Sequence, residues 1–415
     1  MPSAKSPLIK PFRGLRPTSE TAAAVAAPPY DVMSSSEARQ MVVGRPWSFL
    51  HISRPEVDLP EGSDPYGEAV YAKAAENLQH ACQSGVLFQD EQECYYVYRL
   101  TMGEHRQTGL VAIASVSAYD QGRIKRHEFT RPTKEDDRVR QIDALNAQTG
   151  PVFLVYSATA AVDQQLAETT ALPPEICVTA EDGVIHELWS LSTPATLQGL
   201  SAAFAAMPAL YIADGHHRSA AASRVAAARR SDASGEQAAD YFLSVIFPHD
   251  QMQILPYNRV VRDLNGLNQE ELLRALGETF QLEPSPVPVA PHQSGCFGLY
   301  LPGQWYRLTL PAAKIPKDPV KALDVSLLAD QLIEPLLGIS DPRRDERIDF
   351  VGGIRGLGEL ERRVDSGEMA VAFSLYPTSM EQLMAVADAD QVMPPKSTWF
   401  EPKLADGLVS HLIGS

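Results

Sequence analysis

Residues 208–213 (PALYIA), followed by Asp214-Gly215-His216-His217-Arg218 and by residues 219–225 (SAAASRV), decide the fold of this chain. The first part is apolar and the last part favours helix, so the sequence predicts a buried strand that leads through a glycine turn into a helix. Glycine lets the backbone approach a ligand closely, and the first amides of a helix have no acceptor within it. Such junctions bind anions, and Arg218 and the two histidines add donors that suit phosphate.

The same turn is compatible with two structures that bind no anion. A helix capped by Asp214, with the histidines at the surface, would have the same residue pattern. A metal site is the weaker alternative, because His216 and His217 are adjacent and point in different directions, and no HxxxH pair lies nearby.

Composition narrows the class of protein. The chain has 415 residues, of which 44% are hydrophobic and 21% charged, which is ordinary for a globular protein of roughly two or three domains. Its formal net charge of -16 would repel nucleic acid, so no nucleic-acid partner is expected, whereas a small anion can still be a substrate. The oligomeric state is left open.

Cysteine usage and hydropathy indicate a cytoplasmic protein with no membrane partner. No stretch of about 18 apolar residues occurs, and the N-terminus lacks the apolar core of a signal peptide. The four cysteines are scattered without a CxxC pair, which argues for reduced thiols and against a zinc cluster or a disulfide scaffold.

Periodicity and turn residues predict a mixed α/β (α+β) fold with a mixed sheet and an additional C-terminal α/β region. Helices are expected over about 66–85, 219–228, 268–280, 324–337, 356–364 and 379–387, and strands over about 94–101, 108–118, 152–156, 241–247, 297–301, 305–310, 348–351 and 370–375. Residues 229–235 are expected to form a polar loop. The proline-rich segment 283–292 is the predicted linker between a core of residues 1–282 and a subdomain of residues 293–415 that contributes a loop to the site.

The segment 124–138 (IKRHEFTRPTKEDDR) is the densest polar cluster besides the glycine turn. Phosphoryl transfer requires cations on the phosphates, a carboxylate for magnesium and often a carboxylate that accepts the proton of the attacking hydroxyl, and this segment contains all three types. A solvated loop leading into a helix that begins near Pro132 accounts for the same residues without catalysis.

Three further places have plausible roles. Tyr30 and Asp31 could project into a cleft, although Asp31 could equally cap the turn that follows it. The loop Lys396-Ser397-Thr398 could hold a carboxylate or phosphate, or could simply be docked by the aromatic residues after it. Arg259 is either a phosphate contact or part of a structural ion pair.

Several motifs, in the same order over nearly the full chain, resemble a widespread prokaryotic domain-of-unknown-function family. They are Pro11-Phe12-Arg13, Pro29-Tyr30-Asp31-Val32, Ser48-Phe49-Leu50-His51, Lys125-Arg126-His127-Glu128, the turn at 214–218 and Met393-Pro394-Pro395-Lys396-Ser397-Thr398. The match identifies a family more than an activity.

The turn itself resembles the phosphate-binding turn of the ParB and sulfiredoxin superfamily, whose members bind or hydrolyse nucleotides and include free serine kinases. The resemblance implies a ParB/sulfiredoxin-like nucleotide-binding core in which Gly215, His216, His217 and Arg218 hold nucleotide phosphates. Sulfiredoxin chemistry requires a cysteine where His216 stands, so sulfinic acid repair is not expected. Partition function would require a helix-turn-helix and DNA affinity, which this acidic chain does not indicate.

These observations lead to the hypothesis of a magnesium-dependent kinase that moves a phosphoryl group from ATP or ADP to the hydroxyl of a small molecule, with free serine or a related hydroxy acid as the candidate acceptor. The expected catalytic residues are Glu128 as general base, His127 and Arg218. The expected ligand-binding residues are Asp214, Gly215, His216, His217, Arg218, Lys125, Arg126, Lys396, Ser397 and Thr398, with magnesium on Asp137 or Asp214. A nucleotide-binding regulator without turnover and a phosphatase or nucleotidase are the alternatives.

Overall fold

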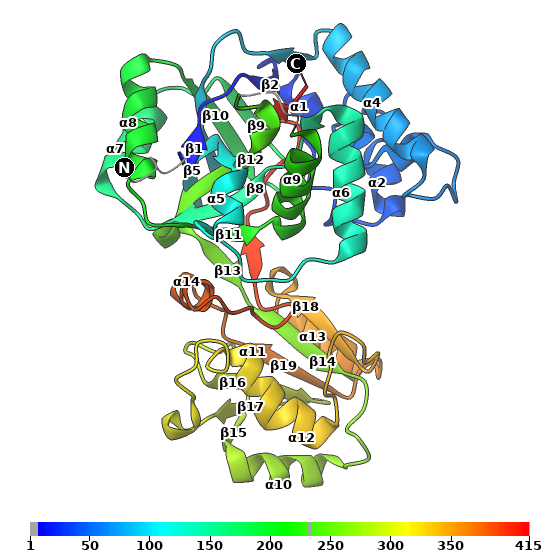
Figure 1. The fold of residues 1–415 in the computed structure, drawn as a ribbon. Helices are drawn as coiled ribbons and strands as arrows, with labels where there is room; N and C mark the ends of the chain where they lie inside the picture. The colour runs from blue at the N-terminus through cyan, green and yellow to red at the C-terminus, as the bar shows by residue number, and fades with distance from the viewer. Residues whose placement is uncertain (1–6, 231–234, 415) are drawn as a thin grey trace. The chain divides into compact units, whose positions relative to one another are not determined.

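The computed structural model describes residues 7–230 and 235–414, so most of the polar loop expected at 229–235 lies outside the described residues. The chain folds into two compact units (Figure 1). The first comprises residues up to Met252 and again from Pro402, and the second is Gln253–Glu401. The second unit is therefore an insertion into the first.

The predicted linker at 283–292 lies inside the second unit. Residues Gln281–Ser285 form strand β15, which pairs antiparallel with β17 (Gln304–Thr309). Prolines are tolerated there because β15 lies at the edge of its sheet. Val289 beyond it is buried, so the segment packs onto the unit instead of joining two domains.

A nine-stranded mixed sheet organises the first unit. Its order is β6 (Ile124–Lys125), β11 (Leu210–Asp214), β8 (Val152–Tyr156), β12 (Tyr241–Pro248), β5 (His105–Ser115), β4 (Tyr95–Met102), β10 (Ile185–Leu191) and β9 (Ile176–Thr179), with β1 (Ile9–Lys10) beside β5. Every residue of β8 and β12 is buried, as expected for central strands covered on both faces. The mixed α/β class predicted from periodicity is confirmed.

Helices α6 (Pro132–Leu145) and α9 (His216–Arg229) pack against each other, and α9 also packs on β8 and β12 (Figure 1). The buried face of α9 consists largely of small residues, including Ala221, Ala222 and Ala226. Small side chains let a helix approach its neighbours closely. This packing fixes the N-terminus of α9 against the carboxyl end of β11.

A smaller four-stranded sheet, in the order β3 (Leu87–Gln89), β2 (Gly14–Pro17), β21 (Ser410–Leu412) and β7 (Ala147–Gln148), closes the first unit. Strand β21 comes from the C-terminal segment that follows the second unit. An additional backbone bridge joins Asp406 of that segment to Ala27. The C-terminal segment therefore lies beside the N-terminal segment that contains Tyr30.

Most of the elements predicted in the first unit are confirmed. Helix α4 (Glu68–Gln83) and the strands β4, β5, β8 and β12 lie where the sequence predicts them. Helices α2 (Ser35–Met41), α7 (Ala160–Thr170) and α8 (Pro194–Ala205) complete the larger elements of this unit. Asp31 caps no helix, because Ser34 is the N-cap of α2 in a capping box with Glu37.

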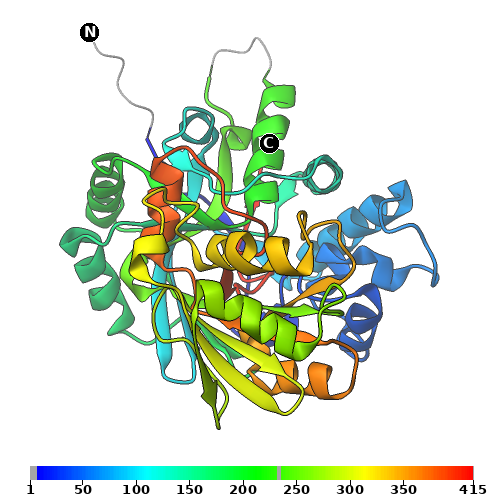
Figure 2. The same ribbon diagram turned by 90° about the horizontal axis from the view of Figure 1, so that it is seen from below.

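The second unit contains a six-stranded sheet in the order β15, β17, β16 (Cys296–Leu301), β19 (Val371–Leu375), β14 (Tyr257–Val261) and β18 (Ile348–Gly352). Figure 2 shows the strands β15 to β17 and helix α10 (Gln269–Thr279) of this unit. The predicted hairpin at 297–310 and the predicted helices are confirmed as β16, β17, α10, α13 (Gly358–Asp365) and α14 (Met380–Asp388). The short strands β13 (Gln253–Leu255) and β20 (Trp399–Glu401) pair with each other.

The helix predicted at 324–337 is interrupted by one irregular turn. It consists of α11 (Asp324–Leu328), a π-helical turn over Ala329–Ile333 and α12 (Glu334–Leu337). Pro335 cannot donate a backbone hydrogen bond into the preceding turn, which fits a local change of hydrogen-bond pattern.

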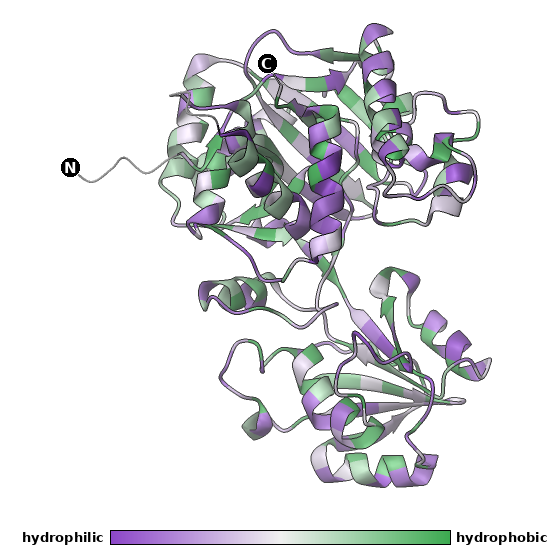
Figure 3. Ribbon diagram, turned by 45° about the vertical axis from the view of Figure 1, so that its right-hand side comes forward, coloured by the Kyte–Doolittle hydropathy of each residue, from purple (hydrophilic) through white to green (hydrophobic). Residues whose placement is uncertain are grey.

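The distribution of apolar and polar residues differs between the strands and the helices of the two units. Figure 3 shows apolar residues recurring along the strands and polar residues frequent along the helices and loops. Among residues 7–230 and 235–414, no helix combines the length and the hydrophobicity that crossing a lipid bilayer demands.

Candidate functional site

The turn between β11 and α9 has the geometry of an anion site. Gly215 is the N-cap of α9, with φ 93° and ψ 26°, a left-handed conformation that favours glycine. Gly215 has no side chain that could cap the helix, and Asp214 Oδ1 accepts the amide of Gly215 itself at 2.7 Å. No described residue accepts the amides of His216 and His217. Two helix-terminal N–H groups are therefore available to a ligand.

Close packing also requires glycine at this position. A Cβ added at position 215 would lie 3.3 Å from the Cα of Val152, which is tighter than ordinary van der Waals contact. Strand β8 therefore supports the turn from behind, and the backbone conformation of Gly215 is held by its neighbours.

The two histidine rings of the turn hold the charged segment 124–131 in place. His216 Nε2 accepts the amide of His127 at 3.4 Å, and His217 Nε2 accepts the amide of Arg131 at 3.0 Å. Strand β6 also pairs in parallel with β11 through Ile124 and Lys125. The structure thus brings the charged segment and the glycine turn together, which the sequence could not establish.

Both rings act as acceptors and are therefore neutral. Burial, together with the nearby rings of His127 and His217, holds the pKa of His216 well below its ordinary value. Burial also lowers the pKa of His217. Since Nε2 of His216 accepts, its proton is on Nδ1, which faces Glu128 Oε2 at 3.8 Å.

His127 lies deeper than the rest of the segment. Its ring meets that of His216 edge to face, with centroids 4.5 Å apart, and burial lowers the pKa of His127 to about 4. The backbone of Ile212 next to the ring opposes part of this lowering of the pKa. Of the predicted cations, Lys125 lies in β6, whereas Arg126 is exposed beside His216.

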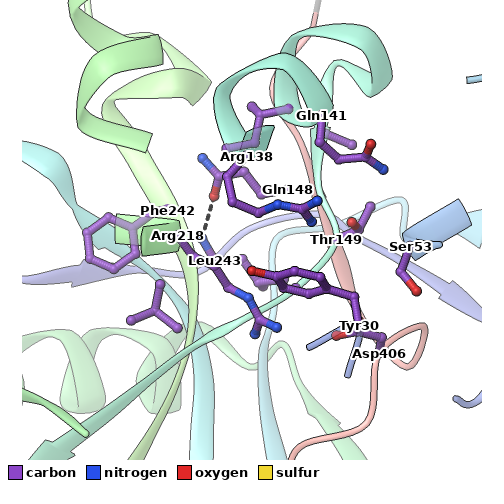
Figure 4. A pocket seen from close by; sticks show the side chains of 14 residues that line it. Tyr30, Ser53, Arg138, Gln141, Gln148, Thr149, Arg218, Phe242, Leu243 and Asp406 are labelled. Atoms are coloured by element: carbon purple, nitrogen blue, oxygen red, sulfur yellow. Dashed lines mark hydrogen bonds between the residues drawn. The ribbon is translucent and has the colours of Figure 1, made fainter. Parts of the chain in front are cut away.

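Arg218 extends from the turn into the interior of the first unit. Its Nη1 donates to the Pro151 carbonyl at 2.7 Å. Its guanidinium carbon lies 5.2 Å from the centre of the Tyr30 ring, and that of Arg138 lies 4.0 Å from the same ring. Figure 4 shows Tyr30 between the two guanidinium groups. Tyr30 was singled out from the sequence, but Arg138 was not assigned a site role.

Acidic side chains surround Arg218. Burial lowers the pKa of Arg218, but Asp406, Asp31, Tyr30 and Asp214 together raise it above its ordinary value. Burial raises the pKa of Asp406 to about 7, against the opposing effect of Arg218 and Arg138. Asp214 is 3.5 Å from Lys403 Nζ.

Besides Arg138, sequence reasoning missed Asp406 and Lys403. Both lie in the C-terminal segment, nearly two hundred positions from the turn, in a stretch without a recognisable motif. The pairing of β21 with β2 and β7 and the Asp406–Ala27 bridge attach this segment to the first unit.

The two proposed magnesium ligands are not equivalent. Both oxygens of Asp137 are engaged, Oδ1 by the Tyr71 hydroxyl at 2.9 Å and Oδ2 by Arg138 at 2.7 Å. In residues 7–230 and 235–414 there is no group of three or more histidine, cysteine or acidic side chains spaced to hold a metal ion. Asp214 is the acidic residue that belongs to the turn itself.

The remaining predicted residues, Lys396, Ser397 and Thr398, lie in the second unit. Ser397 Oγ donates to the Pro394 carbonyl at 2.6 Å, and its own carbonyl accepts the Thr378 hydroxyl at 2.9 Å. Arg259 is buried and donates to backbone carbonyls, including that of Lys396 at 2.9 Å. Burial lowers the pKa of Arg259 to about 10. This arrangement gives Arg259 a role in holding the loop.

Fold and site together define a mixed α/β protein in which a strand-to-helix turn presents unpaired amides beside a half-buried arginine. The family model described as protein of unknown function (DUF1015) matches residues 9–326, and the chain belongs to this family. No curated protein matches the sequence.

Similar solved structures are distant. A free serine kinase in complex with AMP has 13% sequence identity and a TM-score of 0.35, over 72% of this chain and 92% of that chain. A conserved hypothetical protein from Pyrococcus furiosus has 12% identity and a TM-score of 0.33, over 72% and 95% of the two chains. SbnI with a C-terminal truncation, from Staphylococcus aureus, has 10% identity and a TM-score of 0.38, over 71% and 85%. At this distance the similarities carry no argument about activity.

Proposed function

We propose that this protein transfers a phosphoryl group from ATP or ADP to the hydroxyl of a small molecule, with free serine or a related hydroxy acid as the acceptor. The observation that carries the proposal is the turn at Gly215, where two unpaired amides, the Arg218 guanidinium and the Glu128 carboxylate are held by one element junction. Such a turn within a ParB/sulfiredoxin-like core would bind the nucleotide by its phosphates.

The backbone would make the phosphate contacts in this proposal. The imidazole rings of His216 and His217 are engaged with the amides of residues 127 and 131, so their own amides, not their rings, face the phosphate. Arg218 adds a permanent positive charge that suits phosphate oxygens. The developing charge of the transferred group would be stabilised by these fixed donors.

Glu128 is the proposed general base. Its carboxylate would accept the proton of the acceptor hydroxyl while the oxygen forms a bond to phosphorus and the bond from phosphorus to the departing nucleotide breaks. His216 would orient Glu128 through its Nδ1 proton, at 3.8 Å in the present geometry. His127 would act behind it as a buried, neutral support for the His216 ring.

Magnesium would enter with the nucleotide. The ion usually takes one or two protein carboxylates and completes its shell with phosphate oxygens and water, so a site with few carboxylates fits it. Asp214 is the proposed ligand because it lies in the turn and its Oδ2 has only a long contact, 3.5 Å from Lys403 Nζ. Both oxygens of Asp137 accept shorter hydrogen bonds, which gives that residue a structural role. The ion would neutralise phosphate charge.

The test is incubation of the purified protein with ATP or ADP, magnesium and a panel of hydroxy acids. A phosphorylated acceptor supports the proposal, inorganic phosphate alone indicates a nucleotidase, and nucleotide binding without turnover indicates a regulator. If no nucleotide raises the melting temperature, the phosphate site itself is wrong.

Two variants separate the proposed roles. Arg218→Ala should abolish the nucleotide-dependent rise in melting temperature, whereas Arg224→Ala, an exposed arginine of the same helix that pairs with Asp136, should retain it. Glu128→Gln should retain the rise and lose turnover by at least a hundredfold, a loss typical of a missing general base. Loss of nucleotide binding in Glu128→Gln would contradict this division.

A further inference from the structure

A narrow pocket in the first unit adjoins the turn. Arg218 lines both the pocket and the turn. The other walls come from α6, residues 147–152, β12, Ser53 and the segments around Tyr30 and Asp406 (Figure 4). There is room for about two water molecules, which also suits a single carboxylate group and is too small for a nucleobase.

Two buried oxygen atoms in this pocket lack partners. Ser53 Oγ and Asp406 Oδ1 both have no hydrogen-bond partner among the described residues, although Ser53 is 4% exposed and Asp406 is 2% exposed. Buried polar atoms are almost always paired, so two unpaired oxygens that line one pocket point to a polar occupant.

The guanidinium groups that line the pocket use only part of their hydrogen-bond donors within the protein. Arg138 uses Nε and Nη2 on Asp137, and Arg218 uses Nη1 on the Pro151 carbonyl. The other N–H groups of the two guanidinium groups meet no acceptor in the described part of the chain. Asp406 forms an ion pair of 4.0 Å or less with neither arginine. A bound molecule could therefore lie between the Asp406 carboxyl and the two guanidinium groups.

We infer that this pocket binds the carboxylate of the acceptor substrate, through Arg218, Arg138, Ser53 and Asp406. The inference rests on the proposed function and adds the place where the carboxylate of the hydroxy-acid acceptor binds. Its carboxylate accepts hydrogen bonds from the two guanidinium groups, from the Ser53 hydroxyl and from the protonated Asp406 carboxyl. Because Arg218 is shared, the hydroxyl a few bonds away reaches the phosphate side of the turn.

Asp406 makes this binding depend on pH. The charged and titratable groups that face it are Arg218 from α9, Arg138 from α6, and Tyr30 and Asp31 from the N-terminal segment. Burial raises the pKa of Asp406 to about 7, so below this pH the carboxyl is protonated and donates. Above it, the carboxylate repels a bound anion. Carboxylate affinity therefore falls as the pH rises through about 7.

The experiment measures binding without nucleotide, by calorimetry at pH 6 and pH 8, of lactate, glycerate and serine. Each is compared with an analogue that lacks the carboxylate, namely lactamide, glycerol and serinamide. The expected result is binding of at least one acid at least tenfold tighter than its analogue at pH 6, and weaker at pH 8. Equal affinity for each acid and its analogue, or no binding of any acid, would overturn the inference.

Variants localise the site. Ser53→Ala and Asp406→Asn should each keep the nucleotide-dependent rise in melting temperature. Ser53→Ala should weaken acid binding at least tenfold, and Asp406→Asn should remove the pH dependence of acid binding. Ser326→Ala is the matched control, because Ser326 is also buried without a partner for its hydroxyl among the described residues but does not line the pocket. Acid binding unaffected by both pocket variants would place the carboxylate elsewhere.

The two hypotheses fail in different ways. If nucleotide does not change the melting temperature of the wild type, the proposed phosphate site is wrong, but tighter binding of acids would still support the pocket. If nucleotide binds but the affinity does not depend on the carboxylate, only the inference about the pocket is wrong.

Discussion

Each residue of the glycine turn has a separate role. Gly215 supplies a left-handed backbone, and Arg218 carries charge inward to Tyr30. His216 and His217 are the residues whose appearance in the sequence is most misleading, because a pair of histidines suggests ligand contact. Their ring nitrogens instead accept backbone amides of the neighbouring segment.

Gly150 controls the position of Arg218. A Cβ at position 150 would lie 3.0 Å from both Cζ and Nε of that arginine, so Gly150→Ala must displace the guanidinium group by a few tenths of an ångström. We expect a weaker nucleotide-dependent rise in melting temperature. The melting temperature without nucleotide should change little, since Arg218 can shift toward the pocket. An unchanged response to nucleotide would mean that the position of Arg218 is not critical.

Burial of His127 makes stability depend on pH. The unfolded chain binds a proton at His127 near pH 6.5, but the folded protein does so only near pH 4. The unfolded state therefore binds more protons in this window, and acidification from about pH 6.5 to 4 lowers the free energy of unfolding.

The variant His127→Leu removes this contribution. Between pH 7 and pH 5, the free energy of unfolding should fall by about 1–2 kcal/mol less in the variant than in the wild type. Urea denaturation at each pH measures this difference. His80→Gln, at an exposed position, should follow the wild type. Parallel pH profiles for His127→Leu and the wild type would contradict the assignment.

At the scale of elements, replacing glycine by alanine should have opposite effects on stability in the turn and inside a helix. Gly215→Ala forces a side chain into a left-handed conformation and against Val152, so we expect a loss of about 1–2 kcal/mol in the free energy of unfolding. Gly199→Ala, inside helix α8 with nothing within 4 Å of the added carbon, should instead gain about 0.5–1 kcal/mol. Urea denaturation of both variants checks the opposite signs.

Elements were predictable where a local signal was strong. The strand β8 and the helix α10, with its Asn268 capping box, follow from apolar runs and cap residues that act within a few positions. The proline-rich stretch at 283–292 was wrongly assigned as a linker, because an edge strand tolerates proline and the sequence does not reveal which strand lies at the edge.

The whole molecule is expected to unfold in two steps. Contacts gather within two units, each with its own apolar core. Leu154→Ala in the first unit and Leu308→Ala in the second each remove a fully buried side chain, and we expect each to cost about 2–5 kcal/mol. Hydrogen exchange should show lost protection confined to the mutated unit. Uniform loss across both units would indicate a single cooperative domain.

The sequence by itself determined the mixed α/β class, most of the elements and the strand-to-helix turn, because these depend on residues close together in the chain. Only the tertiary structure placed the charged segment against the turn and supplied Arg138, Lys403 and Asp406. Their proximity arises from the pairing of β6 with β11 and from the return of the chain as β21 after a unit of about 150 residues. Such long-range pairings depend on the packing of the whole unit, which no local pattern records.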